Sequence, residues 1–160
     1  MDVKTTGYMK RYIVIMAALC LTALVGCDKD KSEWAKADKN IVGEWTLENW
    51  DGEKTDDFNV YMKLNGNGHF EIYQQVTTAY YELYTGVYRA DKGVLSGEYS
   101  DGVLWNDSYD YSLSNDGNRL TLVTQSGSHI RSVYVRSKVP SDIVVDNSSR
   151  SAASSVRRAL

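Results

Sequence analysis

Apolar and polar side chains alternate along most of the chain from residue 41 to residue 137. The stretch FNVYMKL, residues 58–64, is a clear example, because every second side chain from Phe58 onward is large and apolar. A repeat of two residues is typical of a β-strand that buries one face and leaves the other in contact with water. We therefore expect this part of the chain to form a sheet.

Short turns rich in glycine, asparagine and aspartate separate the alternating stretches. NGNG at 65–68 and NDGN at 115–118 contain residues that tolerate the positive φ angles of tight hairpins. The strand at 80–90 is aromatic on both faces, so its inward register stays open. The predicted strands are residues 41–49, 58–64, 69–76, 80–90, 94–100, 105–113, 119–125 and 129–137.

The strands follow one another without an intervening helical repeat, which favours a sandwich or an up-and-down barrel. Closing the sheet into a barrel removes the unpaired edges that would otherwise invite aggregation. The chain has 12 tyrosines, 12 glycines and 1 proline, a composition that favours β-structure with tight turns. We predict an all-β fold, an eight-stranded antiparallel up-and-down barrel.

The N-terminal residues follow a different pattern. Basic residues up to Arg11 precede an apolar run at 12–25, and the small Gly26 and then Cys27 follow it. This order is typical of a secretory signal. The run is shorter than the roughly twenty residues that a membrane-spanning helix needs, so a spanning helix is disfavoured.

The residues LVGC, 24–27, resemble the lipobox of bacterial lipoproteins position by position. The resemblance implies that the chain is cut before Cys27, that the Cys27 thiol carries a diacylglycerol, and that acyl chains such as palmitate anchor the protein in a membrane. Stable anchoring needs more than one such chain. The alternatives are an ordinary cleaved signal with Cys27 near the cut, or an uncleaved anchor.

The predicted organisation has four parts. Residues 1–26 are a lipoprotein signal peptide, 27–40 the lipidated cysteine and a charged tether, 41–138 the barrel domain, and 139–160 a flexible tail rich in serine and arginine. Removal of 1–26 leaves 160 − 26 = 134 residues with 18 − 3 = 15 basic and 21 − 1 = 20 acidic side chains, a net charge of −5. A single domain of this size buries a core, and the lack of basic excess disfavours nucleic-acid binding.

VGEW, residues 42–45, places Gly43 and Trp45 at the start of the first predicted strand, and Arg136 lies near the end of the last. This G-x-W pattern with a late arginine resembles the lipocalin superfamily, in which an arginine of the final strand lies across the first-strand tryptophan. The resemblance implies that Arg136 closes the barrel by packing on Trp45, a contact that contributes about 0.5–2 kcal/mol. Arg131, on the opposite face of the same strand, is a competing candidate.

The lipobox, the short tether and the order of the later motifs resemble more closely the small lipocalin-like lipoproteins of Bacteroidota. The matching pieces are MKLNGNGHF at 62–70, Gly86 with Tyr88, and Leu120–Leu122. The resemblance covers residues 41–137. Short loops and the lack of a disulfide and of a clear C-terminal helix set the chain apart from the extracellular lipocalins.

The candidate ligand-binding side chains recur at a spacing of two residues and are Trp105, Asp107, Tyr109 and Tyr111. Flat aromatic groups of this kind line pockets for apolar or ring-bearing ligands, but they serve equally well as core. Asp107 falls on the same predicted face, where a buried acid needs a partner. A tyrosine hydroxyl, an arginine or a ligand would provide one, and a local bulge that turns Asp107 to solvent is the alternative.

Catalytic and metal-binding patterns are weak in this sequence. His69 and His129 each stand beside a turn, without the neighbouring acid, nucleophile or second ligand that a general base or metal site needs. The acidic residues of the turns miss the spacing of a calcium loop. We therefore expect no enzyme activity, no cofactor and no metal.

We expect a monomer that is anchored in the cell envelope, at the outer membrane, by lipid on Cys27 and whose barrel binds a small apolar or aromatic ligand. The alternative is a packed barrel that acts as an interaction or inhibitor module, with loops such as WDGEKTDDF, 50–58, binding a partner protein or a surface glycan. An open cavity of about 300 Å³ or more, lined by Trp105 and Tyr109, would favour ligand binding.

Overall fold

A computed structural model describes residues 36–56, 58–76, 79–127, 129–145 and 158–160, and these residues form nine β-strands. The predictions for residues 1–35, among them the signal peptide at 1–26 and the lipid on Cys27, lie outside the described residues. The strands are β1 (Gly43–Trp50), β2 (Glu53–Lys54), β3 (Asn59–Leu64), β4 (His69–Gln75), β5 (Glu82–Asp91), β6 (Val94–Tyr99), β7 (Tyr109–Leu113), β8 (Arg119–Thr124) and β9 (Arg131–Arg136).

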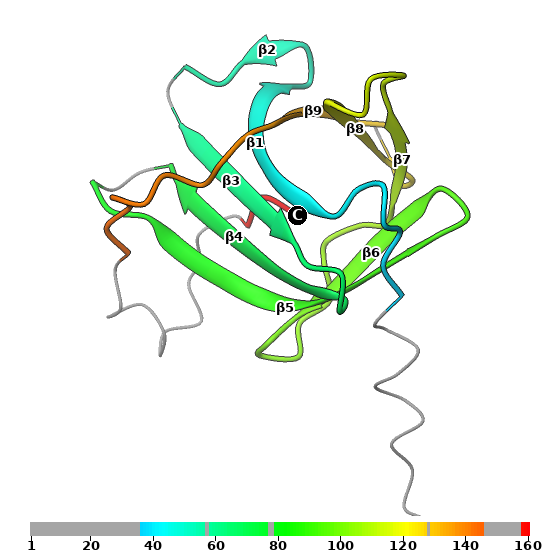
Figure 1. The fold of residues 1–160 in the computed structure, drawn as a ribbon, viewed down its shortest axis with the longest axis horizontal. Coiled ribbons are helices and arrows are strands. Elements are labelled where there is room, and N and C mark those ends of the chain that lie inside the picture. The colour runs from blue at the N-terminus through cyan, green and yellow to red at the C-terminus, as the bar shows by residue number, and fades with distance from the viewer. Residues whose placement is uncertain (1–35, 57, 77–78, 128, 146–157) are drawn as a thin grey trace, which may run out of the picture. The chain divides into compact units, whose positions relative to one another are not determined.

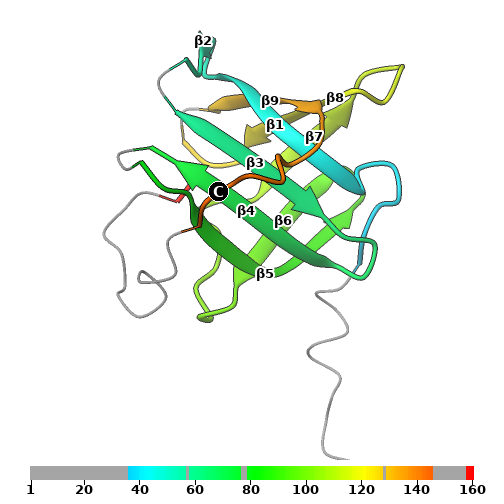
Figure 2. The same cartoon turned by 60° about the vertical axis from the view of Figure 1, so that its left-hand side comes forward.

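The short strand β2 pairs only with the end of β1, and the other eight strands form an antiparallel meander in chain order. The meander closes because β9 returns to pair with β1, from Trp45 opposite Arg136 to Trp50 opposite Ser132. Figures 1 and 2 show the resulting ring of strands from two directions. The predicted all-β, eight-stranded antiparallel up-and-down barrel is confirmed.

The predicted strands differ from the observed ones mainly near residue 105. The strand expected at 105–113 begins only at Tyr109 as β7, and β6 and β7 share just two paired positions, Val94 with Asp110 and Leu95 with Tyr109. The residues before Tyr109 therefore form a loop. The short strand β2 was not predicted, and its two residues are both exposed.

The inward register of β5, which the sequence left open, is that of the even-numbered residues. Gly86, Tyr88 and Ala90 are buried, whereas Val87 and Arg89 between them are only partly so. The Tyr88 hydroxyl donates a hydrogen bond of 2.8 Å to the main-chain oxygen of Asn65 in the turn before β4. The buried phenol therefore spans the interior from β5 to the β3–β4 turn.

One end of the barrel, called the closed end below, is covered by Arg136. Its guanidinium carbon lies 4.1 Å from the centre of the Trp45 ring. The same group donates hydrogen bonds of 3.0 Å to the oxygens of Val42 and Asn40 and, through Nε, one of 3.1 Å to the oxygen of Gly117. The arginine thus ties β9 to the chain that enters β1 and to the β7–β8 turn.

Gly43 makes room for this arginine. Its φ angle is +143°, and a Cβ atom at this position would collide with Nη1 of Arg136. The Trp45 indole is fully buried and donates a hydrogen bond of 2.9 Å to the oxygen of Ile41. Arg131, the competing candidate, is exposed at the other end of β9.

Two parts of the expected tail at 139–160 contact the barrel. The Val139 amide donates a hydrogen bond of 2.8 Å to the Glu44 carboxylate, and the Tyr81 amide donates one of 3.0 Å to the oxygen of Val144. Further along, Leu160 is 1% exposed and belongs to the hydrophobic core. Residues 139–145 and 158–160 are therefore part of the folded unit, and residues 146–157 lie outside the described chain.

Candidate functional site

Four aromatic rings meet inside the barrel. The centre of the Phe70 ring lies 5.6 Å from that of Tyr99 and 5.1 Å from that of Trp105, and the Trp105 and Tyr109 rings are 6.2 Å apart. All of these contacts are edge-to-face, the arrangement that aromatic quadrupoles favour. The cluster joins β4, β6, β7 and the loop before β7.

Trp105, one of the predicted ligand-binding residues, is a core side chain of this cluster. It is 5% exposed, and its ring lies directly on Gly97 of β6. Because any side chain at residue 97 would overlap the indole, Gly97 and Trp105 form one packing unit. The Trp105 indole nitrogen has no hydrogen-bond partner within the described chain.

Asp107 lies in the loop before β7, and its carboxylate is held by the chain around it. It accepts hydrogen bonds from the Ser126 hydroxyl, from the Ser126 amide at 3.2 Å and from the Ser108 amide at 2.8 Å. These donors hold the pKa of the Asp107 carboxyl below its usual range. The acid therefore orders the loop between β8 and β9 against the loop before β7.

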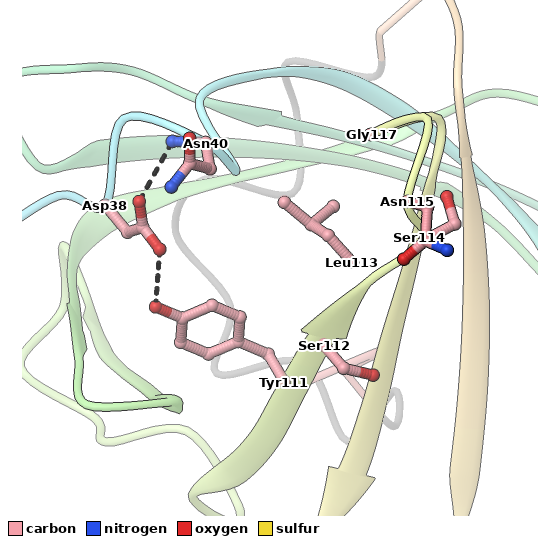
Figure 3. A pocket seen from close by; sticks show the side chains of 8 residues that line it. All are labelled: Asp38, Asn40, Tyr111, Ser112, Leu113, Ser114, Asn115 and Gly117. Atoms are coloured by element: carbon pink, nitrogen blue, oxygen red, sulfur yellow. Dashed lines mark hydrogen bonds between the residues drawn. The ribbon is translucent and has the colours of Figure 1, made fainter.

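Tyr111 lies toward the closed end, away from the other candidates. Its hydroxyl donates a hydrogen bond of 2.8 Å to the Asp38 carboxylate (Figure 3). Burial, with the Asp38 contact added, raises the pKa of Tyr111 to about 12. The surrounding cavity of about 460 Å³ is lined by Asp38, Asn40, Tyr111, Ser112, Leu113, Ser114, Asn115 and Gly117.

Two cavities lie at the opposite end of β1, around Trp50. One of about 410 Å³ is lined by Tyr109 and Asp107 together with the polar groups of Thr124 and Ser132. The other, of about 220 Å³, is largely apolar and lies against Phe58. The Trp50 and Phe58 rings meet edge-to-face with their centres 6.5 Å apart.

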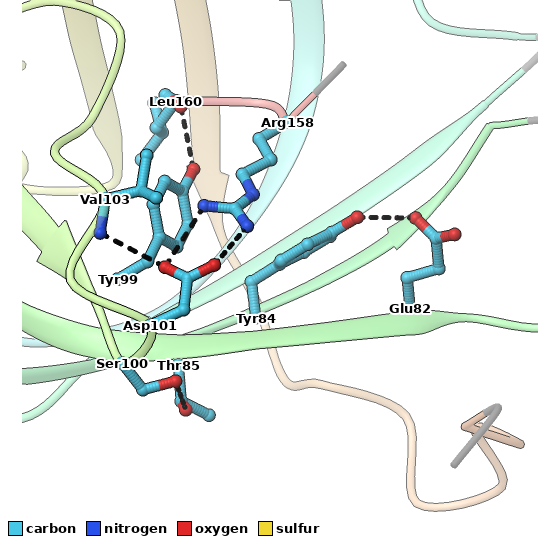
Figure 4. A network of polar contacts seen from close by, with 9 residues as sticks. All are labelled: Glu82, Tyr84, Thr85, Tyr99, Ser100, Asp101, Val103, Arg158 and Leu160. Carbon is cyan, nitrogen blue, oxygen red and sulfur yellow. Dashed lines mark hydrogen bonds and ion pairs between the residues drawn. The ribbon is translucent and has the colours of Figure 1, made fainter. Parts of the chain in front are cut away.

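Residues Arg158–Leu160, called the plug below, line both of these cavities or fill the space beside them. Arg158 and Ala159 contribute to both linings. Leu160 enters the core, where its main-chain oxygen accepts a hydrogen bond of 2.7 Å from the Tyr99 hydroxyl (Figure 4). This end of the barrel, called the plugged end below, combines cavities, aromatic walls and a chain segment that is bound inside.

The structure thus separates the four predicted ligand-binding residues. Tyr109 and Asp107 share the cavity of about 410 Å³, Trp105 lines none of the three cavities described above, and Tyr111 faces the closed end. Trp50 and Phe58 were not predicted as pocket residues. They are the first and last residues of the loop 50–58, which was predicted only as a possible contact surface. The plug was not predicted either, because nothing in the local sequence around Arg158–Leu160 indicates burial.

Metal-binding clusters and membrane-spanning helices are absent from the part of the chain that the structure describes. No group of three or more His, Cys, Asp or Glu side chains there is arranged to hold a metal ion. Among the same residues, no helix is long and apolar enough to cross a membrane. His129 is exposed beside the β8–β9 turn, where Nδ1 lies 3.2 Å from the oxygen of Thr124.

No family model and no curated protein matches this chain. A solved structure is similar to it, that of an uncharacterized protein from Bacteroides eggerthii. The two chains are 17% identical over 60% of this chain and 98% of the other, with a TM-score of 0.43.

Proposed function

We propose that this protein is a binding protein and not a catalyst. It binds a small apolar or aromatic ligand in the plugged end of its barrel. The observation that carries the proposal is the cavity of about 410 Å³ beside Tyr109 and Trp50. Cavities of about 300–1,000 Å³ with apolar walls and a few polar groups are the usual form of small-molecule sites. A ligand here would contact aromatic rings and find hydroxyl groups on Thr124 and Ser132.

The lining supports an apolar ligand more than a strongly polar one. Trp50, Phe58 and Val60 all line the cavity of about 220 Å³, and Val60 is 2% exposed. Burial raises the pKa of the Tyr109 hydroxyl to about 12, so this group is a neutral hydrogen-bonding group at physiological pH. The cavity at the closed end is a weaker candidate, because Tyr111 and Asp38 already satisfy each other there.

The test is a titration of the purified barrel with N-phenyl-1-naphthylamine, a neutral aromatic probe that becomes fluorescent in apolar surroundings. We expect saturable binding, weakened about tenfold or more by Trp50→Ala, because the substitution removes a wall that both cavities share. Tyr111→Phe is the matched control and should bind as the unmodified protein does. Equal binding by all three proteins, or none by any, would refute the proposed site.

We further propose that the protein works at a membrane, as a lipoprotein of the cell envelope anchored through Cys27 at the outer membrane. The proposal is supported by the lipobox-like LVGC at 24–27 and by the charged residues that follow it. Metabolic labelling with an alkyne analogue of palmitate should mark the mature protein. Cys27→Ser should abolish the label and release the protein from the membrane fraction, whereas the control Cys20→Ser should change neither.

A packed barrel that acts as an interaction or inhibitor module is the second candidate function. It is favoured by Val103 and Leu104, neighbouring apolar residues that are 50% and 56% exposed in the loop after β6. Contact surfaces are marked by exposed apolar groups that form a contiguous patch, and two exposed neighbours are a starting point for one. If the probe fails to bind while Leu104→Asp abolishes association with a partner protein from the host envelope, this second function replaces the first.

A further inference from the structure

The plug is recognised through three different kinds of contact, the first of which is to its cation. The Arg158 guanidinium forms an ion pair of 2.5 Å with the Asp101 carboxylate. Its central carbon also lies 4.3 Å from the centre of the Tyr99 ring and 5.4 Å from that of Tyr84 (Figure 4). A carboxylate with two aromatic faces is a site that selects a cation.

The second contact is to the main chain of the plug, and the third is to its apolar side chain. The Tyr99 hydroxyl donates to the Leu160 oxygen at 2.7 Å, and the Asn106 amide group lies 3.5 Å from the same atom. The Leu160 side chain is buried in the core and Ala159 is 8% exposed. The barrel therefore contacts the cation, the main chain and the apolar side chain of the plug, each with groups of suitable chemistry.

The plug also forms a wall between cavities. Trp50, Arg158 and Ala159 line both the cavity of about 410 Å³ and the cavity of about 220 Å³. Removing Arg158 and Ala159 takes away a boundary that the two cavities have in common. The space at the plugged end would then join into one larger site.

The charges that line this site are few. Of the residues that line the two cavities, Asp107 and Arg158 are the charged ones, and Asp101 pairs with Arg158 beside them. When Arg158 leaves, Asp101 and Asp107 remain. The vacated site would carry negative charge and favour a neutral or cationic occupant over an anionic one.

We propose that the plugged end is a binding site for a short chain segment that carries a cation two residues before a branched apolar residue, and that Arg158–Leu160 fill it in cis. A ligand must displace this segment to reach the full site, so the segment acts as a built-in competitor. The role of the segment as a competitor rests on the proposed function, because it requires the apolar ligand to enter at this same end. The binding of a segment in trans does not depend on that function.

The experiment compares the full chain with a variant that lacks residues 158–160. A fluorescein-labelled peptide of residues 154–160, SSVRRAL, is titrated into each protein and followed by fluorescence anisotropy. We expect the peptide to bind the shortened protein and to bind the full chain at least about tenfold more weakly, because the cis segment already fills the site there. A peptide with glutamate in place of both arginines should fail to bind.

N-phenyl-1-naphthylamine is titrated in parallel, and its result separates the two proposals. If removal of residues 158–160 raises the affinity for the probe about tenfold and the peptide competes with the probe, both the small-ligand function and the segment site are supported. If the peptide binds the shortened protein but the probe binds neither, the segment site stands and the small-ligand function fails. If the probe binds both proteins equally and the peptide binds neither, the segment site is overturned.

A second variant keeps the test decisive if the shortened protein does not fold. In the full chain, Arg158→Ala removes the ion pair with Asp101 and so weakens the binding of the cis segment, although the buried Leu160 side chain is unchanged. Peptide and probe should both bind this variant more tightly than the unmodified chain. Arg119→Ala removes the surface ion pair with Glu48, away from the cavities, and is the matched control. Identical affinities for Arg158→Ala, Arg119→Ala and the unmodified protein would overturn the proposal.

Discussion

The hydroxyl of Tyr99 donates a hydrogen bond of 2.7 Å to the main-chain oxygen of Leu160, a residue 61 positions further along the chain. The phenol oxygen of Tyr134, which is fully buried, has no hydrogen-bond partner among the described residues. Burial raises the pKa of both phenols well above the usual value, so both stay protonated at neutral pH. The Tyr99 oxygen therefore contributes a hydrogen bond to the folded state, whereas the Tyr134 oxygen makes none among the described residues.

Replacing each of these tyrosines by phenylalanine should therefore change the free energy of unfolding to different extents. Tyr99→Phe removes the closer donor to the Leu160 oxygen and leaves only the Asn106 amide at 3.5 Å, so we expect a loss of about 1 kcal/mol in the free energy of unfolding. Tyr134→Phe removes a buried hydroxyl that makes no bond and should be neutral or stabilising. Urea unfolding of the two variants measures both values. A larger loss of unfolding free energy for Tyr134→Phe than for Tyr99→Phe would contradict the hydrogen bond of Tyr99 and the lack of one at Tyr134 among the described residues.

Gly97→Ala should disturb the aromatic cluster. A Cβ atom at residue 97 would lie 2.7 Å from Cζ2 of Trp105, so the indole must move. Overpacking of this kind costs about 1–3 kcal/mol, and near-ultraviolet circular dichroism should report the changed indole environment. Gly66→Ala is the control, because its Cβ would meet nothing within 4 Å. Equal stability of the two variants would show that the indole has room to move.

Arg136→Ala should open the closed end. The substitution removes the contact of 4.1 Å with the Trp45 ring and three hydrogen bonds to main-chain oxygens. We expect a loss of about 2 kcal/mol in the free energy of unfolding and an increase in the solvent exposure of Trp45. Arg136→Lys should not restore stability, since an ammonium group cannot reproduce the planar set of donors. Arg131→Ala should change stability by less than about 0.5 kcal/mol.

High pH should destabilise the barrel through its buried tyrosines. Burial raises the pKa of Tyr88 and of Tyr109 to about 12, whereas an unfolded tyrosine ionises near pH 10. The contribution to stability is therefore complete below about pH 10 and is lost as the pH rises toward 12. Unfolding by urea at a series of pH values measures the loss, and absorbance at 295 nm follows ionisation.

Tyr109→Phe is the control variant for the loss of stability at high pH. Tyr109→Phe removes one of the groups with a raised pKa, so the dependence of stability on pH above 10 should become shallower. Titration of Tyr88 and Tyr109 near pH 10, without a fall in stability, would contradict the burial seen in the structure.

The fold was largely predictable from the sequence because its signal is local. Alternation in FNVYMKL and the NGNG turn fix a strand and a hairpin without help from distant residues. The error at 105–113 has a physical reason. The alternation continues back to Trp105, but Trp105 packs on Gly97 from a loop, and the Asp107 carboxylate bonds to Ser126 instead of facing the interior as part of a strand.

The candidate site was less predictable, since its parts come together only through long-range contacts. Tyr109 and Asp107 were identified, but their neighbour Trp50 comes from the far end of β1 and Arg158 from the end of the chain. Nothing in the local pattern around Arg158–Leu160 indicates burial, because a short polar stretch with one leucine is typical of an exposed tail. The partner of that leucine is defined only once the ring of strands exists.

The pairing of β1 with β9 has a consequence for how the chain folds. The Thr46 and Ser137 hydroxyls lie 2.6 Å apart although 91 residues separate them in sequence. Contacts of such long range form slowly, because the intervening chain must first lose much of its freedom. Until they form, β1 and β9 each present an unsatisfied row of backbone groups, and a nascent molecule can pair with a neighbour through either one. Aggregation during refolding should therefore rise with protein concentration and stop once β1 has paired with β9.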